Sequence, residues 1–346
     1  MSKFNFSLFS IVFLLVFFSC KSNKKTALSS SEKNIRIGFY NVENLFDTID
    51  IANKADEEFT PISKKKWNTQ RYFKKLNDLA KVVEAMNYPA ILGMCEVENK
   101  TVLEDFVSKT VLKNKNYGIV HHESPDFRGI DVALIYQKNI FKVTDSEAIT
   151  IHFPKSVIGE DHYTTRDILH VTGILGGKEV VHIFVNHFPS RRGGLQASEP
   201  KRLYVAQQLK KRVDEIFANP NAKVIIMGDF NDEPANKSIT NVLDTKHLLK
   251  RNPADLTNCA DKLDAEGKGT YNYRGNWNLL DQIIVSSSML KKNSKIKIGT
   301  FHIFQKEWMM YKSDKYGPTP SRTYGGPNYY GGYSDHLPVF VDAHVY

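Results

Sequence analysis

Cysteine is scarce in this sequence of 346 residues, which contains only Cys20, Cys95 and Cys259. Two cysteines after residue 34 are too few for a disulfide framework, so a core of apolar side chains must hold the fold. Cysteine and histidine do not cluster at the spacing of a zinc site, and the sequence shows no Ser-His-Asp spacing. Cys95 lies within an apolar run and is predicted to be a buried thiol, not a nucleophile.

Long apolar runs are also missing, except near the N-terminus. Lys3 precedes an almost entirely apolar stretch, Phe9 to Phe18, and Cys20 follows. This stretch is short for a bilayer span and has the layout of a secretory signal. The cysteine after it predicts a lipoprotein signal with a lipid on Cys20, although Phe17 and Phe18 depart from the usual residues before such a cysteine.

The expected organisation is therefore a signal peptide at 1–19, a flexible tether at 20–34 and one domain at 35–346. We expect the protein to be exported and held in the cell envelope by the lipid, or to be periplasmic or secreted if cleavage occurs elsewhere. Through this lipid the protein would be attached to a membrane. Nothing in the sequence implies a protein partner.

A strong excess of one charge is absent as well. The net charge is +9, of which residues 1–34 contribute +4. A domain of about +5 is compatible with a substrate that carries phosphate, but it does not identify nucleic acid.

No linker rich in Gly, Pro or Ser divides residues 35–346, and no internal repeat occurs. Short apolar runs alternate with amphipathic stretches, which is typical of an α/β domain. Helices are predicted at 67–86 and 197–217, where apolar residues recur at helical spacing. Strands are predicted at 35–40, 90–95, 132–136, 168–175, 180–187, 223–230, 279–287, 300–304 and 337–341. The loop 305–334 is long enough to suggest a function.

Polar side chains gather at the ends of six of these strands. Taken singly, each could be a turn former or a helix cap. Together they form a set of acids, amides and imidazoles: Asn41, Glu43, Glu96, Glu98, Asn186, His187, Asp229, Asn231, Asp232, Asp281, Asp335 and His336. Carboxylates and amides are hard oxygen ligands that select Mg²⁺, Mn²⁺ or Ca²⁺. With the imidazoles and nearby arginines, the set suits cleavage of a phosphate ester.

The segments "FYNVENLFD", "NHFPSRRGG", "GDFN" and "GGYSDHLPVFV", in this order, resemble the endonuclease/exonuclease/phosphatase superfamily, also called deoxyribonuclease I-like. The similarity runs from Ile35 to the C-terminus and is strongest to the predicted secreted nuclease branch. The resemblance implies a four-layer α/β sandwich, with two central, mainly antiparallel sheets packed face to face and helices outside. It also implies a metal-dependent hydrolase acting on phosphate ester bonds.

The resemblance assigns roles to the matching residues. Glu96, Asn41 and Asp335 are the expected metal ligands, with Mg²⁺ the expected ion and Mn²⁺ or Ca²⁺ as alternatives. Asp229 and Asn231 match the pair that activates water and contacts the scissile phosphate. His336 is expected to contact the phosphate, with Asp281 orienting it. His187 resembles the second histidine of the deoxyribonuclease branch.

Several positions stay open. Glu43 is either a second metal contact or a turn residue, and the latter is favoured. Glu123 is a candidate acid to orient His187. Asp131 could belong to the site, whereas Glu98 and Asp232 are expected to be structural.

Arginines near these motifs are the expected substrate contacts. Arg191, Arg192 and Arg128 are predicted to bind phosphate, and Arg322 with the loop 324–333 is predicted to lie at the rim of the site. Guanidinium groups beside tyrosines suit a nucleic acid, in which charge and ring faces alternate.

The function expected is thus an exported endonuclease that hydrolyses phosphodiester bonds of nucleic acid. Alternatives are a phosphomonoesterase or lipid-headgroup phosphodiesterase on the same fold, and more remotely a non-catalytic surface binding protein. An abasic-site repair enzyme is disfavoured by His187 and by the signal sequence. The sequence leaves open which histidine is the acid and which the base.

Overall fold

A computed structural model describes residue 1 and residues 33–159, 163–246, 252 and 254–346. Lys33–Tyr346 forms one compact unit. The signal peptide predicted at 1–19 and the lipidation site at Cys20 lie outside the described residues. Within the described residues, no helix has both the length and the apolar character needed to cross a membrane.

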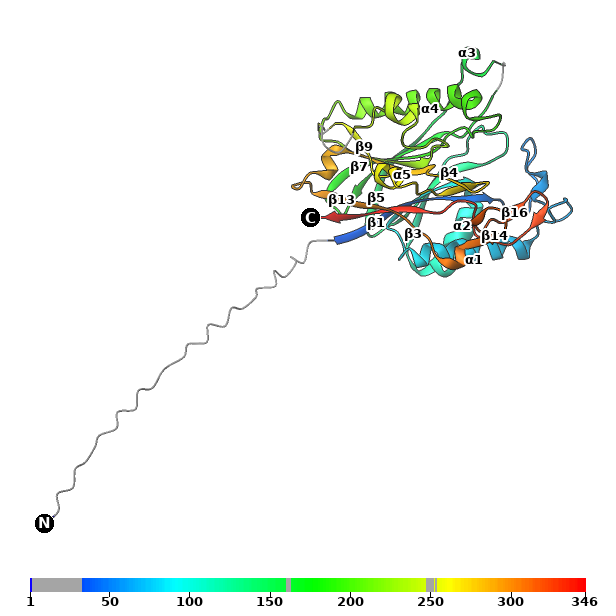
Figure 1. Cartoon of the computed structure of the whole chain (residues 1–346), viewed down its shortest axis with the longest axis horizontal. Coiled ribbons are helices and arrows are strands. Elements are labelled where there is room, and N and C mark those ends of the chain that lie inside the picture. The colour runs from blue at the N-terminus through cyan, green and yellow to red at the C-terminus, as the bar shows by residue number, and fades with distance from the viewer. Residues whose placement is uncertain (2–32, 160–162, 247–251, 253) are drawn as a thin grey trace. The chain divides into compact units, whose positions relative to one another are not determined.

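One six-stranded sheet contains the first and the last strand of the domain (Figure 1). Its order is β13 (Ile296–Ile303), β18 (Val339–Val345), β1 (Lys33–Leu45), β2 (Ile91–Val97), β4 (Asp131–Gln137) and β3 (Tyr117–His121). Only the central pair, β1 with β2, is parallel.

The second six-stranded sheet repeats this plan. Its order is β5 (Phe141–Ile149), β6 (Ile168–Leu175), β7 (Glu179–His187), β8 (Lys223–Asp229), β12 (Asp281–Ser286) and β9 (Leu256–Asn258). Again only the central pair, β7 with β8, is parallel. Both parallel pairs therefore send two carboxyl ends to the same edge of their sheet.

The two sheets pack face to face through alternate side chains of their strands. Ile37 and Phe39 of β1 belong to the same buried cluster as Ile225 and Met227 of β8. A Cβ atom on Gly93 of β2 would lie 2.6 Å from the Met227 sulfur, so the sheets approach each other too closely there for a larger residue. Since side chains alternate across a strand, the neighbouring residues face outward.

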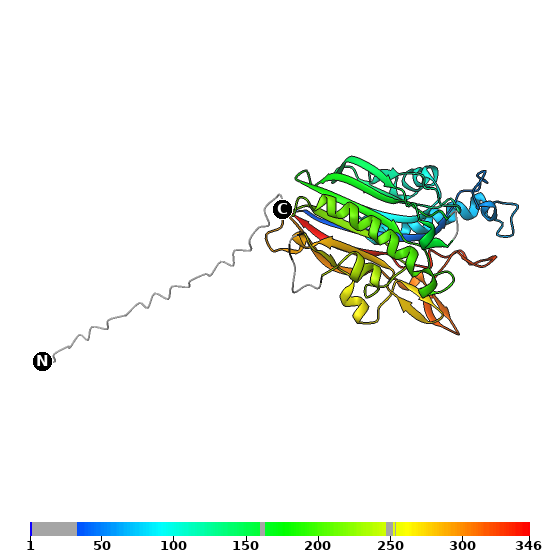
Figure 2. The ribbon, with the colours of Figure 1, turned by 90° about the horizontal axis from the view of Figure 1, so that it is seen from above.

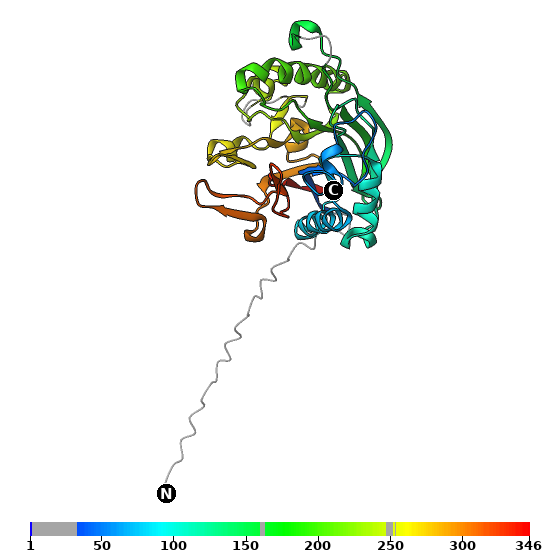
Figure 3. The same ribbon diagram turned by 90° about the vertical axis from the view of Figure 1, so that its right-hand side faces the viewer.

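Helices cover the outer faces and complete four layers (Figures 2 and 3). α1 (Thr69–Ala85) and α2 (Lys100–Ser108) bury their apolar sides on the first sheet. The side chains of Asn68 and Asn99 cap their first turns. α4 (Leu195–Ile216) covers the second sheet, and two short helices, α3 (Lys155–Ile158) and α5 (Asp261–Ala265), lie between strands. The predicted α/β sandwich is confirmed.

Three hairpins project from the sandwich. They are β10 (Tyr271–Tyr273) with β11 (Asn276–Asn278), β14 (Met310–Ser313) with β15 (Gly317–Pro320), and β16 (Tyr324–Gly325) with β17 (Asn328–Tyr329). The first two contact each other and extend from the same side of the domain, in gold and orange in Figure 3. The loop predicted at 305–334 thus carries two of the three hairpins.

Candidate active site

Strand register brings the predicted site residues to one edge of the sandwich. His187 and Asp281 both pair with Asp229, as the last residue of β7 and the first of β12. On the other sheet, Asn41 of β1 pairs with Cys95, the residue before Glu96. β18 runs antiparallel to β1, so the segment before it, with Asp335 and His336, returns to the same edge.

Asp229 lies at the centre of this edge. Its Oδ2 accepts a hydrogen bond of 3.1 Å from the Asn41 amide of the opposite sheet. The Nε2 atoms of His187 and His336 lie 3.7 and 3.8 Å from the same oxygen. One carboxylate oxygen therefore faces two imidazoles. A water or phosphate oxygen bound beside Asp229 would be close enough to exchange a proton with either ring.

His336 is oriented by Asp281, as the resemblance implies. Its Nδ1 donates to Asp281 Oδ2 over 2.7 Å, and both side chains are buried. The remaining ring nitrogen, Nε2, is thereby directed at Asp229 and the space beside it. Burial opposes the charge on this ring, but the Asp281 and Asp229 carboxylates raise the pKa of His336 well above its usual value.

His187 is held differently. Its Nδ1 is buried and has no hydrogen-bond partner among the described residues. The backbone around it is fixed by Arg166, whose Nη2 donates to the carbonyls of His187 and Phe188 at 2.9 and 2.7 Å. Burial, and then the Arg166 charge, lower the pKa of His187 well below its usual value. The two histidines therefore sit in opposite electrostatic surroundings.

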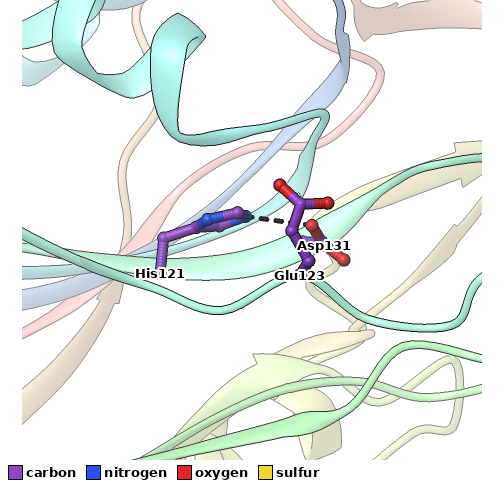
Figure 4. A group of neighbouring side chains, drawn as sticks. All are labelled: His121, Glu123 and Asp131. Carbon is purple, nitrogen blue, oxygen red and sulfur yellow. Dashed lines mark hydrogen bonds and ion pairs between the residues drawn. The ribbon is translucent and has the colours of Figure 1, made fainter. Parts of the chain in front are cut away.

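The candidate acid Glu123 does not orient His187. It lies instead in a cluster with His121 and Asp131 (Figure 4). Both carboxylate oxygens of Asp131 have partners near that cluster. Oδ2 pairs with His121 Nε2 at 2.9 Å, and Oδ1 accepts a hydrogen bond from the Ser124 backbone. The prediction for Glu123 was wrong because Asp131 and His121 are its closer neighbours in the folded chain.

Three residues of the candidate set have a strained backbone. Glu43, Glu96 and Asn231 have φ angles of 49°, 63° and 48°, in the left-handed region that side chains with a Cβ rarely adopt. At Glu96 the ladder between β2 and β4 shifts register, which turns this side chain out of the strand. Such strain is typically stored at functional sites.

Oxygen atoms suited to a divalent cation flank Asp229. Glu96 Oε2 accepts from the Asn44 backbone, whereas Oε1 points toward His187 Nε2 at 3.9 Å. Asp335 pairs through one oxygen with Arg322. At this edge, possible ligand atoms of Asp229, Asp281 and His336 lie within 4.8 Å of one another, and this group does not include Glu96 or Asp335. This donor set of carboxylates, amide and imidazole fits a hard divalent ion.

Glu43 holds the loop that follows β15. Its carboxylate accepts from the backbone of Thr323 at 2.7 Å and of Tyr324 at 3.4 Å. Lys75 of α1 is also buried and donates to Thr323 Oγ1 and to the Tyr333 carbonyl, both at 2.6 Å. Burial and the Asp335 charge raise the pKa of Glu43 to about 7. Both Glu43 oxygens thus face the loop.

The three predicted phosphate-binding arginines lie in unlike surroundings. The Arg191 guanidinium donates hydrogen bonds to other residues of the protein. Its Nε donates to the Asn231 carbonyl at 2.7 Å, and its Nη1 donates to Asn278 Oδ1 at 3.2 Å. Arg192 is exposed. Arg128 is half exposed and lies 3.6 Å from Asp126. Arg191 therefore supports the backbone of Asn231, whereas Arg192 and Arg128 remain on the surface.

Some contacts at the site cannot be read from the sequence. Ser334 donates to the Asn41 carbonyl at 2.7 Å and accepts from the His336 backbone, which ties β1 to the segment before β18 within the first sheet. Arg166 precedes β6 and Lys75 lies within α1, far from any strand end. For Arg166 and Lys75, the only signal in the sequence is a basic residue at a position where the pattern of the element is otherwise ordinary.

A scan against models of protein families matches residues 36–344 to the endonuclease/exonuclease/phosphatase family. The chain belongs to this family. Its members hydrolyse phosphate esters, and the candidate site is consistent with a divalent-metal site, as the family requires. Comparison with curated proteins finds no match.

Solved structures of the family share its fold. A mannosyl-6-phosphatase from Bacteroides thetaiotaomicron is 16% identical with a TM-score of 0.55, over 89% of this chain and 99% of that chain. The catalytic domain of human nocturnin is 18% identical with a TM-score of 0.54, over 90% and 93%. A further family protein from Bacteroides thetaiotaomicron is 15% identical with a TM-score of 0.54, over 91% and 96%. At these identities the similarity shows the fold alone.

Proposed function

We propose that this family member is a phosphodiesterase, an exported endonuclease that hydrolyses phosphodiester bonds of nucleic acid. The observation that carries the proposal is Asp229 Oδ2 with imidazole nitrogens at 3.7 and 3.8 Å. A phosphodiester needs a base for the incoming water and an acid for the departing oxygen, and this arrangement offers both beside one carboxylate.

The chain's own residues divide the remaining work. Asp229 orients the water, Asn231 contacts the scissile phosphate, and Asp281 holds the His336 ring against it. We propose Mg²⁺ as the ion, held by Glu96 and Asp335 with support from Asn41. When bound, the ion neutralises negative charge that develops on the phosphate oxygens.

A direct test is a screen of the purified protein with Mg²⁺ on plasmid DNA, RNA, bis-p-nitrophenyl phosphate, sphingomyelin and mannose 6-phosphate. We expect hydrolysis of DNA or RNA and of the small diester. His187→Ala and His336→Ala should each reduce both rates by about 10²-fold or more. Near-normal turnover in both variants would overturn the assignment.

A phosphomonoesterase is the second candidate. The fold is shared with a protein described as a mannosyl-6-phosphatase, so the monoester belongs in the same screen. Hydrolysis of mannose 6-phosphate without hydrolysis of any diester would replace the first proposal with this one.

We also propose a lipid anchor on Cys20 that places the protein in the cell envelope, supported by the apolar run before that residue. Membrane fractionation tests it. The wild-type protein should sediment with membranes, and Cys20→Ser should release it or block its processing. A soluble wild-type protein cleaved at another position would reject the anchor.

A further inference from the structure

A pocket of about 660 Å³ opens beside the candidate active site, between the three projecting hairpins. Tyrosines dominate its walls: Tyr271, Tyr273, Tyr311, Tyr316, Tyr329 and Tyr330. The volume is that of a site for one small organic group, not of a groove for a duplex.

The pocket is continuous with the catalytic residues. Arg322 and Asp335 line it, and they form an ion pair with each other. The Tyr271 ring lies 4.8 Å from the His336 ring, centroid to centroid, and the backbones of these two residues form a β-bridge. A group attached to a phosphate at His336 would therefore reach the pocket directly.

The walls offer ring faces and hydrogen-bond donors. Tyr311 and Tyr330 are 62% and 64% exposed, so their rings are free to cover a ligand. Asn272 Nδ2 and Arg322 Nε are buried and have no hydrogen-bond partner in the described part of the chain. Arg274 adds a second positive charge, and Asp335 is the single acid in the lining. A buried donor without a partner is costly unless a ligand supplies an acceptor.

We propose that this pocket binds the base of a nucleotide whose phosphate lies at Asp229 and His336. A nucleobase presents two ring faces for tyrosines and several acceptors for Asn272 and Arg322. A base within a duplex is stacked and paired, so only an unpaired base can enter. The enzyme would then favour single strands or strand ends. This inference rests on the proposed phosphodiesterase function.

A matched pair of substrates tests the pocket separately from the chemistry. Methyl p-nitrophenyl phosphate and the p-nitrophenyl phosphate esters of thymidine, attached at the 5′ or the 3′ oxygen, share a leaving group and differ in the nucleoside. We expect kcat/KM for one thymidine ester to exceed that for the methyl ester by at least about fivefold, which corresponds to the weakest stacking energy of about 1 kcal/mol for one base. Single-stranded oligonucleotides should be cut faster than the same sequence in a duplex.

Variants then locate the effect. Tyr330→Ala and Tyr311→Ala should each lower kcat/KM for the preferred thymidine ester by about tenfold and leave the methyl ester unchanged. Asn272→Asp keeps the oxygen that accepts from the Gly275 backbone at 2.9 Å but removes the Nδ2 donor, so it should act in the same direction. Tyr346→Ala, at the exposed C-terminal end of β18, is the control and should change neither rate.

Affinity gives a readout that does not depend on turnover. Fluorescence anisotropy with a labelled single-stranded phosphorothioate oligonucleotide in EDTA should show weaker binding for Tyr330→Ala than for Tyr346→Ala. Equal kcat/KM for thymidine and methyl esters, or unchanged affinity in both pocket variants, would overturn the base pocket while the phosphodiesterase stands. Hydrolysis of none of these diesters would overturn the proposed function itself.

Discussion

Asp281 shows how one side chain can control another at the site. It is fully buried, and its Oδ2 receives the 2.7 Å hydrogen bond from His336 Nδ1. Asp281→Asn keeps the volume but removes the charge that orients the imidazole. We expect kcat to fall by about 10–100-fold with little change in KM, because His336 would still be present but wrongly oriented.

Steady-state kinetics on bis-p-nitrophenyl phosphate measures this effect. Asp342→Asn, which breaks a partly exposed ion pair with Arg36, is the matched control and should keep full activity. An Asp281→Asn enzyme with wild-type kcat would show that His336 needs no orienting acid.

Arg191 and Arg192 are adjacent, yet we expect different results from them. Arg191→Ala removes the 2.7 Å bond to the Asn231 carbonyl, so it should lower kcat on small and polymeric substrates alike. Arg192→Ala removes only an exposed charge. It should raise KM for nucleic acid. The slope of log KM against the logarithm of the salt concentration should fall by the amount that corresponds to the loss of about one phosphate contact. Equal behaviour of the two variants would contradict these separate roles.

His182 of β7 makes stability depend on pH. Burial, and then the charge of His170, lower the pKa of His182 to about 4. In the unfolded chain the ring has a pKa of about 6.5 and binds more protons, so acid favours unfolding between these values. The stability that the neutral ring provides is complete above about pH 6.5 and is lost as the pH falls toward 4.

Urea unfolding of His182→Gln at pH 7 and pH 5 tests this coupling. The variant should lose less free energy of unfolding between the two pH values than the wild type. His302→Gln, an exposed histidine of β13, should behave as the wild type does. An unchanged pH dependence in His182→Gln would show that other groups cause it.

At the scale of elements, the loop before β18 depends on α1. Lys75 donates to Thr323 Oγ1 and to the Tyr333 carbonyl, and its side chain is buried. Lys75→Met should lower the free energy of unfolding by about 2–4 kcal/mol, since two charge-assisted hydrogen bonds are lost and Glu43 stays buried. The loop that carries Arg322 should become more sensitive to protease.

Urea unfolding and limited proteolysis measure the two effects of Lys75→Met. Lys138→Met, an exposed lysine after β4, is the control and should change stability by less than about 0.5 kcal/mol. Equal stability of Lys75→Met and wild type would mean that the loop is held by Glu43 alone.

Most elements were predictable because their patterns are strong. α1 (Thr69–Ala85) and α4 (Leu195–Ile216) begin and end within two residues of the predicted helices, since apolar residues recur at helical spacing. Among the strands of the two large sheets, β3, β5 and β9 were not predicted. β5 reads "FKVTDSEAI" and lies at an edge of its sheet, where one pairing side and much of the surface are solvated, so no apolar run marks it.

At the scale of the whole molecule, activity should require a metal because oxygen donors converge from both sheets. EDTA should abolish hydrolysis, and Mg²⁺ or Mn²⁺ should restore it. Glu96→Gln removes one charged ligand and should raise the Mg²⁺ concentration needed for half-maximal activity. Titration of the stripped protein with Mg²⁺ measures this. Full activity in EDTA after stripping would contradict a metal-assisted reaction.

The sequence by itself determined the α/β class of this protein and the polar side chains from which its candidate site is built. Alternation, helical periodicity and the polar residues after apolar runs are local features, and each can be read from a few neighbouring residues. They sufficed for an α/β domain and for the acids, amides and imidazoles around Asp229, whereas the four-layer sandwich followed from the resemblance of the motifs to the family. They also located Cys95, which is buried as predicted.

Tertiary structure alone decided which partner each side chain takes. Glu123 joins His121 and Asp131, not His187; Arg191 turns to Asn231; and Glu43 meets the loop at Thr323. The tyrosine pocket likewise joins three hairpins spread over residues 271–329. The physical reason is that hydrogen bonds and burial depend on distances between segments far apart in the chain, which packing sets and local pattern does not record.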